Sequence, residues 1–395
     1  MPWKETCAME QRMEFILKTR NKEESMAAVC RYFGISRETG YKWLRRYAAS
    51  GMEGLKDLSR VPHYSPGAVS DAIEEAIVAA RIGHPHWGAK KLVAWLGRQD
   101  GQTIWPAPST VGQILHRRGL TIPRRRSRRS PIYTSPFLAC DGPNAVWSGD
   151  LKGWFRTGDG SRCDPFTLSD NYSRYLLRCQ AVAAVDYAHI RPILEAAFRE
   201  YGLPLAVRTD NGVPFASTTV GGLSRLSIWL LRLGVIPERI APARPAQNGR
   251  HERMHRTLKA ETAAPPQYSL RAQQRCFDHF RREYNHERPH EGIAQQTPAS
   301  LYSPSPKPYP ARLPEIAYPK GYTLRKVRGQ GEFKWRSHPI HLSATLAGET
   351  VGFNQIDDHR WVIYFGSIRL AQLDTRHYRI IHYPKRRRRL RTVTH

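Results

Sequence analysis

The sequence predicts a multidomain protein, with an all-α N-terminal part, a central α/β domain and a small antiparallel β-barrel near the C-terminal end. The first observation is length, because 395 residues exceed what one ordinary hydrophobic core organises. The second is periodicity: apolar residues recur at helical spacing up to about residue 118, and short β-branched runs begin at about residue 144. The third is the change, after residue 313, to short strands separated by Gly, Ser and Asp-Asp turns.

Residues 1–61 predict a three-helix unit, with helices over residues 9–20, 25–33 and 36–48. Gly34-Ile35 makes a tight turn, and Ser36 is a good N-cap for the last helix. Two short helices across a glycine turn form a helix-turn-helix layout, whose second helix presents its first residues to the DNA major groove. A plain helical hairpin has the same pattern, but the basic composition favours DNA binding. The predicted DNA contacts are Arg37, Thr39, Tyr41, Lys42 and Arg45.

Residues 62–121 predict a second unit of similar size, again interpreted as helix-turn-helix, with helices over residues 69–82, 87–96 and 109–118. A basic linker follows at residues 122–139. Such a run is usually a solvated tether, but in this chain we expect it to lie along a DNA backbone as a basic arm. Its arginines are Arg124, Arg125, Arg126, Arg128 and Arg129.

Residues 140–303 predict a mixed sheet with helices packed on it. Strands are expected in AVWSGDL (145–151), in the run 166–182 and in PLAVRTD (204–210). Helices are expected over residues 189–201, 223–233 and 248–262. Residues 304–384 are assigned to the barrel, and residues 385–395 form a basic tail.

The charge balance indicates a nucleic-acid partner. The chain has 62 Lys and Arg against 34 Asp and Glu, a net charge of +28, and such an excess favours binding to a polyanion. Six cysteines without a C-x-x-C pair argue against a zinc site and a disulfide framework, and they suit a reducing cytosol. No leader-like or membrane-spanning apolar run is evident. We therefore expect a soluble cytoplasmic protein that binds double-stranded DNA and no membrane.

Three carboxylates predict a metal site. Asp150 lies in an apolar strand, where a carboxylate is costly unless it is paired or binds a metal. Asp210 follows a strand and precedes a turn, and Glu252 lies in the first turn of a helix. Each alone fits an ordinary strand, turn or helix start. Together, in a basic α/β chain, they favour phosphoryl transfer on nucleic acid with two Mg²⁺ ions, because Mg²⁺ prefers oxygen ligands.

A second interpretation of the same helix stays open at this point. His251-Glu252-Arg253-Met254-His255 matches H-E-x-x-H, the zinc-binding helix of metalloproteases. The strongly basic helix, its start directly after Asn-Gly and the lack of an evident third zinc ligand argue against it.

Four segments give the chain a resemblance to a known family. They are WSGD (147–150), TDNG (209–212), RPAQNGRHERMHRTLK (244–259) and YNHERPH (284–290), which is followed by Thr297-Pro298. In this combination the sequence resembles the DDE transposases of bacterial insertion sequences, whose core is similar to retroviral integrase. The resemblance extends over about residues 25–300, and it favours the transposase interpretation of the Glu252 helix over the metalloprotease one.

The resemblance implies an RNase H-like core in which Asp150, Asp210 and Glu252 are the catalytic metal ligands. It implies two Mg²⁺ ions per active site, with Mn²⁺ able to substitute, nicking at the element ends and joining of the 3′-OH to target DNA. It also implies a homo-oligomer, at least a dimer on DNA, in the cytoplasm of a bacterium and associated with its nucleoid. Further implied DNA contacts are Asn211, Arg244, Asn248, Arg256, Lys259 and Arg288.

One departure from the family and two alternatives remain. Asp210 and Glu252 lie 42 positions apart, which is longer than the family's common spacing, and we expect the extra length in a loop at residues 217–227. One alternative function is a catalytically silent, transposase-derived DNA-binding regulator. The other is a general RNase H-like nuclease.

Overall fold

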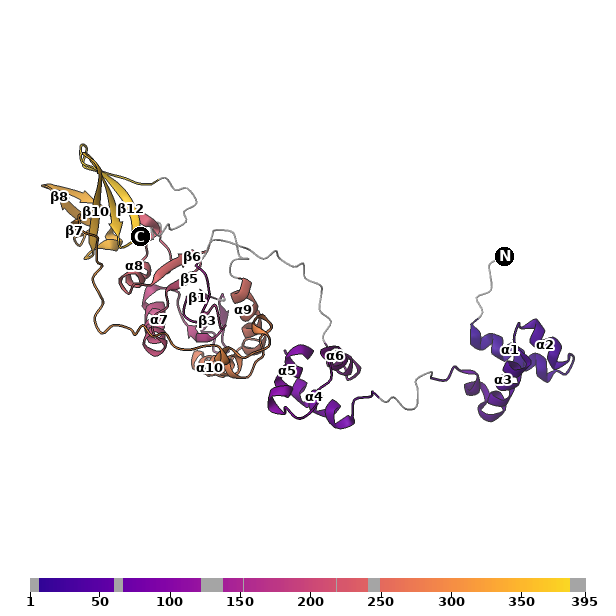
Figure 1. Cartoon of the computed structure of the whole chain (residues 1–395). Coiled ribbons are helices and arrows are strands. Elements are labelled where there is room, and N and C mark those ends of the chain that lie inside the picture. Colours follow the sequence, from indigo (N-terminus) through magenta and orange to yellow (C-terminus); the bar gives the residue numbers. More distant parts are fainter. Residues whose placement is uncertain are drawn as a thin grey trace. The chain divides into compact units, whose positions relative to one another are not determined.

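A computed structural model of the chain describes residues 7–59, 67–121, 138–151, 153–217, 219–240 and 249–383, with side chains from residue 251 onward in the last range. The chain divides into two compact units, residues 1–68 and 69–395, which are coloured along the sequence in Figure 1. Several predicted DNA contacts lie outside the described residues: the five linker arginines, Arg244, Asn248 and the basic tail.

The first unit is the predicted three-helix domain. Its helices are α1 (Ala8–Arg20), α2 (Met26–Tyr32) and α3 (Arg37–Ser50), followed by the short 3-10 helix η1 (Gly51–Leu55). Ser36 caps α3 through its side chain, which accepts a hydrogen bond from the Thr39 amide at 3.1 Å. Gly40 lets α3 approach its neighbours, because a Cβ there would stand 2.7 Å from Cys30 Sγ and 2.9 Å from Phe15 Cζ.

The second helical domain has its own core. It contains α4 (Asp71–Gly83), α5 (Ala89–Gln99) and α6 (Pro108–Arg117). Trp87, Leu92 and Ile114 are buried in its apolar cluster. Trp87 precedes α5 rather than starting it, because Gly88 is the N-cap.

The central domain is built on a mixed sheet. Its strands are β1 (Val146–Leu151), β2 (Phe155–Arg156), β3 (Arg162–Asp170), β4 (Leu176–Val182), β5 (Ala206–Thr209) and β6 (Ile236–Arg239). The order is β4-β3-β1-β5-β6, with β2 pairing to the start of β3. β1 and β3 are antiparallel, β3 and β4 likewise, whereas β1, β5 and β6 run parallel. Hairpin strands first and crossover strands later match the predicted mixed sheet.

Helices cover both faces of this sheet. Trp147, Phe166 and Val207 point to one face and pack in one apolar cluster with α7 (Tyr187–Tyr201) and α8 (Arg225–Arg232). Cys163 and Cys179 point to the other face and pack with α9 (Gly249–Thr262) and α10 (Leu270–His286). Side chains alternate between the two faces along a strand. The face of any other strand residue, and whether it points toward α9, therefore follows from its register with these residues.

Helix α10 was not predicted from the sequence. It shows the expected helical period all the same, with Leu270, Phe277, Phe280 and Tyr284 turned to the sheet. The polar residues between them hid that period. Arg281 donates to the Leu177 carbonyl at 2.8 Å, which ties the helix to β4.

The C-terminal strands form open sheets instead of the predicted closed barrel. Their bounds are β7 (Thr323–Lys326), β8 (Glu332–Trp335), β9 (His338–His341), β10 (Thr350–Asp357), β11 (Arg360–Phe365), β12 (Ile368–Asp374) and β13 (Arg379–Ile381). Five strands follow the order β13-β12-β11-β10-β7, and β8 pairs only with β9. The prediction of short antiparallel strands is confirmed. Closure is not found among the described strands, in which β7 and β13 remain edges of the larger sheet.

Residues of the central domain pack against the C-terminal sheet. Leu223, just before α8, and Ile228, in the first half of α8, lie in the same apolar cluster as Phe353 and Leu370 of the C-terminal sheet. The segment expected as a loop insertion thus contains the 3-10 helix η2 (Val220–Gly222) and the first turn of α8. Arg232 adds a hydrogen bond from Nε to the Pro314 carbonyl at 3.0 Å. Residues between Asp210 and Glu252 therefore pack against the C-terminal sheet.

In the part of the chain that the structure describes, no helix has the length and apolarity needed to cross a membrane.

Candidate active site

Two of the predicted carboxylates lie toward the carboxyl ends of neighbouring strands, Asp150 in β1 and Asp210 directly after β5. β1 pairs in parallel with β5, with Trp147 opposite Val207 and Ser148 opposite Arg208. The paired register ends there: Asp150 lies two positions beyond Ser148 in β1, and Asp210 lies two positions beyond Arg208, directly after β5. Asp150 shares the face of Ser148, which is the face covered by α9, since side chains alternate along a strand.

Asp210 and Asn211 are fixed by local bonds. Asp210 Oδ1 accepts the Gly212 amide at 3.1 Å, and Asn211 Nδ2 donates to the Ile240 carbonyl at 2.7 Å. These bonds tie the turn after β5 to the end of β6. The predicted DNA contact Asn211 thus has a main-chain partner in this structure.

Helix α9 brings the third carboxylate to a groove beside Asp150. A cavity of about 570 Å³ is lined by Asp150, Leu151, Glu252, His255, Arg256, Lys259, Ala260 and Ala264. Glu252, Arg256 and Lys259 recur on one side of the helix, at i, i+4 and i+7, and all three are exposed. Two carboxylates and two cations therefore face one groove, which suits metal ions and DNA phosphates.

Asp210 does not line this cavity. Within the described ranges, no three His, Cys, Asp or Glu side chains stand close enough to hold a metal ion as a group. The donors themselves fit Mg²⁺, because carboxylate oxygens are the ligands it prefers and it keeps several waters. The structure thus brings Asp150 and Glu252 together and leaves Asp210 at the end of the adjacent strand.

The two histidines of the H-E-x-x-H segment are turned toward the sheet. His251 Nε2 and His255 Nε2 each lie 2.7 Å from Thr167 Oγ1. All three side chains are buried, and burial lowers the pKa of His251 to about 4. The two rings therefore take part in a side-chain network with β3. In a metalloprotease helix, by contrast, both rings would bind one zinc ion. Sequence reasoning missed Thr167, which no motif marks.

Arg288 lies in a buried environment. It is 6% exposed, and its Nη1 donates to Glu261 Oε1 at 2.7 Å. Its guanidinium also stands 5.9 Å from the ring of Trp87. The sequence-based expectation of a DNA contact does not suit a side chain placed in this way.

Helix α3 exposes four of the five DNA contacts that the sequence predicts in it. Arg37, Tyr41, Lys42 and Arg45 are exposed on α3, whereas Thr39 is half-buried. Thr39 Oγ1 lies 2.9 Å from Ser36 Oγ and its amide is held by the cap, so its first role is to start the helix.

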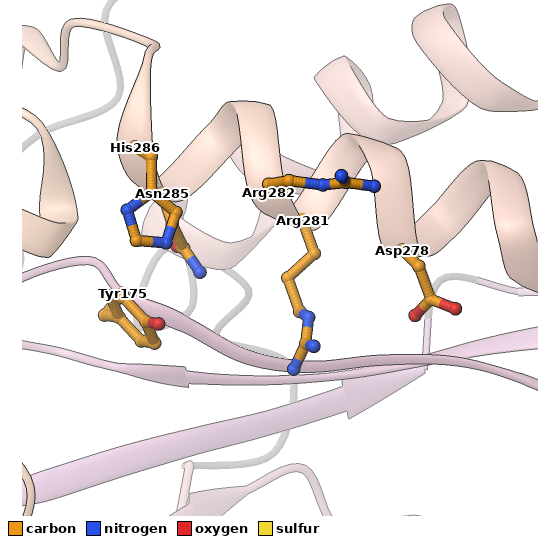
Figure 2. A pocket seen from close by; sticks show the side chains of 6 residues that line it. All are labelled: Tyr175, Asp278, Arg281, Arg282, Asn285 and His286. Carbon is orange, nitrogen blue, oxygen red and sulfur yellow. The ribbon is translucent and has the colours of Figure 1, made fainter.

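A second cavity, of about 300 Å³, lies away from the carboxylates. It is lined by Tyr175, Asp278, Arg281, Arg282, Asn285 and His286. Figure 2 shows Arg281 reaching from α10 toward the strands. This second cavity is lined by none of the predicted site residues.

Comparisons with protein families agree with this layout. The integrase core domain matches residues 141–245 and, as a second family of that description, residues 233–298. Homeodomain-like domains match residues 8–56 and 39–115. The family matches thus cover both helical domains and the central sheet.

Two bacterial relatives are proteins of insertion elements. An uncharacterized 31.7 kDa protein of element IS407 from Burkholderia multivorans is 27% identical over 254 residues, which make up 62% of this chain and 87% of that protein. An uncharacterized 39.2 kDa protein of element IS476 from Xanthomonas euvesicatoria is 28% identical over 238 residues, or 60% of this chain and 66% of that protein.

Solved structures give weaker similarity. A chain of the simian T-cell lymphotropic virus intasome bound to the PP2A regulatory subunit B56 gamma is 17% identical, with a TM-score of 0.36, over 79% of this chain and 100% of that chain. The HTLV-2 integrase catalytic core in complex with magnesium is 14% identical, with a TM-score of 0.32, over 41% of this chain and 98% of that chain.

The integrase core matches, the two homeodomain-like matches and the insertion-element relatives give one conclusion. They support a DDE transposase of an insertion sequence, with an integrase core and homeodomain-like DNA-binding domains.

Proposed function

We propose that this transposase binds the terminal repeats of its element, nicks the element ends and joins the 3′-OH to target DNA. The observation that supports the proposal is that Asp150 and Glu252 line one groove, while Asp210 directly follows β5, the parallel neighbour of β1. Asp150, Asp210 and Glu252 would hold two Mg²⁺ ions, or Mn²⁺ in their place. Two bound ions supply activation of the attacking oxygen and stabilisation of the leaving oxygen.

The remaining groove residues would act on the DNA. Arg256 and Lys259 are exposed on the side of α9 that carries Glu252, so they can neutralise phosphates on both sides of the scissile bond. Glu252 and Asp210 would complete the metal site when the DNA is bound, because catalytic contacts tighten in the reacting complex. The exposed residues of α3 would read the terminal repeat in the major groove.

A strand-transfer assay tests this proposal. Labelled DNA from the two flanks of the gene is incubated with a plasmid target in Mg²⁺ or Mn²⁺. Joined product is expected from the wild type and not from Asp150→Asn, Asp210→Asn or Glu252→Gln. Asp278→Asn is the matched control, because this carboxylate lines the other cavity.

Each alternative gives a different result. Binding of the end DNA with no product from any variant would favour a catalytically silent regulator. Cleavage without sequence preference or joining would favour a general nuclease. Unchanged joining by all three carboxylate variants would show that the site is elsewhere.

The assembly is part of the proposal. The chain would act at least as a dimer on DNA, because two element ends must be brought together for joining to one target. Sedimentation of the chain with and without end DNA measures this directly.

A further inference from the structure

A line of buried and half-buried polar side chains runs from β3 to Asp150. Ser169 Oγ lies 3.5 Å from His251 Nδ1, and His251 Nε2 lies 2.7 Å from Thr167 Oγ1. On the other side of Thr167 Oγ1, at 2.7 Å, stands His255 Nε2. His255 Nδ1 then faces Asp150 Oδ2 at 3.8 Å.

The backbone places these groups. β3 is antiparallel to β1 with Thr167 opposite Asp150 and Ser169 opposite Ser148, so Thr167 and Ser169 look toward α9. His251 and His255 are one helical turn apart, which puts both rings over β3. Their centroids are 4.8 Å apart, edge to face.

The Thr167 hydroxyl has one hydrogen to give, and this decides the direction of the bonds. It can serve His255 Nε2, His251 Nε2 or the main-chain oxygen of Asp150, which is 3.2 Å away. If the hydroxyl donated to His251 Nε2 or to the Asp150 carbonyl, a neutral His255 would have to carry its ring hydrogen on Nε2 and donate it to Thr167 Oγ1. Its Nδ1 lone pair would then face the Asp150 carboxylate, which is repulsive.

Donation to His255 removes that conflict. The ring then keeps its hydrogen on Nδ1 and offers it to Asp150 Oδ2. His251 gives its Nε2 hydrogen to Thr167 and accepts from Ser169, so every bond in the line has one donor and one acceptor. Both rings are at most 4% exposed.

We propose that His255 is a positioning residue for the metal site, oriented by Thr167 and His251 so that its Nδ1–H faces Asp150 Oδ2 at 3.8 Å and attracts that carboxylate electrostatically. The other oxygen, Oδ1, accepts the Leu151 amide at 2.8 Å. Both carboxylate oxygens then face a neighbouring group of the protein, and the side chain lines the groove. The inference rests on the proposed function, because it takes Asp150 as a metal ligand.

The wild-type chain tests the tautomer without any activity measurement. Long-range ¹⁵N–¹H spectra of the ¹⁵N-histidine-labelled chain distinguish a ring with hydrogen on Nδ1 from one with hydrogen on Nε2. His251→Asn and His255→Asn assign the signals. We expect Nδ1–H for His255 and Nε2–H for His251; Nε2–H or a doubly protonated ring at His255 would overturn the proposal.

Metal binding tests the consequence. Thr167→Val has nearly the shape of threonine without the hydroxyl, and Thr167→Ser keeps it. Removing an outer partner of a metal ligand weakens metal binding by about 10- to 100-fold. By calorimetric titration with Mg²⁺ and then Mn²⁺, we expect this loss for Thr167→Val and for His255→Phe, and affinity close to wild type for Thr167→Ser. Melting without metal checks that each variant is folded.

The results separate the two proposals. Wild-type metal affinity in folded Thr167→Val and His255→Phe would defeat the positioning role and leave the proposed function standing. A wild-type chain that binds neither ion, with or without end DNA, would defeat the proposed function. If Thr167→Val does not fold, the wild-type tautomer and the His255→Phe titration still decide.

Discussion

Arg288 and Glu261 form a buried ion pair at 2.7 Å, between the segment after α10 and the last turn of α9. The two side chains are only 7% and 15% exposed. Removing one partner of such a pair leaves the other charge buried without compensation. The pair therefore holds α9, and with it Glu252, against the end of α10.

Arg288→Gln should destabilise the fold rather than weaken a DNA contact. Breaking a buried pair costs about 3 kcal/mol, to be measured as a loss in the free energy of unfolding by urea. Arg282→Gln is the matched control, an exposed arginine on α10, and should change that energy by less than about 0.5 kcal/mol. A stable Arg288→Gln chain that binds DNA poorly would contradict the structural role.

The environment of Arg288 is a feature that the sequence alone does not predict. The motif YNHERPH pointed to its importance, and nothing in the local sequence distinguishes an arginine that meets DNA from one that meets Glu261. The partner comes from another helix, 27 positions earlier. Thr167 went unnoticed for the same reason, since its partners lie on α9, more than 80 positions later.

Local patterns predicted most of the helices and strands. The cap at Ser36, the turn at Gly34 and the strand around Asp150 all stand as expected. Closure of the C-terminal sheet could not be predicted from strand patterns, because Leu223 and Ile228 of the central domain supply part of its core. Alternation of apolar and polar residues along a strand predicts that one face of the sheet is buried. It does not predict which element packs against that face.

The salt dependence of DNA binding should fall when the groove cations are removed. Arg256→Ala with Lys259→Ala removes two positive charges that face the Asp150 groove. If each neutralises one phosphate, the slope of log affinity against log salt should fall in magnitude by about 0.9 per contact. Fluorescence anisotropy with labelled end DNA over a series of salt concentrations measures this slope. An unchanged slope in the double variant, equal to that of Arg275→Ala on α10, would remove both residues from the DNA interface.

Replacing Gly331 by alanine should lower the free energy of unfolding more than the same change at Gly348. Both have a positive φ, +84° and +87°, so alanine costs about 1 kcal/mol at either. At Gly331 the added Cβ would also overlap main-chain atoms of Ser343 and Ala344, whereas nothing lies within 4 Å at Gly348. Urea unfolding should show a loss of about 3 kcal/mol for Gly331→Ala and about 1 for Gly348→Ala. Equal losses would mean that the neighbouring chain gives way freely.

Stability should fall in acid because of His290. Burial, and then the charge of Lys91 on α5, lower its pKa to about 3; Arg288 and Arg174 act in the same direction, while its bond to the Tyr284 carbonyl opposes them. The unfolded chain has an ordinary histidine pKa of about 6.5, so between these values the unfolded state binds more protons and stability is lost as pH falls. The slope from this one group is at most about 1.4 kcal/mol per pH unit.

His290→Gln should flatten the curve in that window. The free energy of unfolding is measured by urea at steps of pH between the two pKa values, for wild type and variant. The difference between them should shrink as the pH falls, because only the wild type loses the contribution of a neutral buried imidazole. His279→Gln, at an exposed position on α10, should keep the wild-type slope. A parallel pair of curves for wild type and His290→Gln would mean that the ring is charged in the fold or that its site opens to water before it titrates.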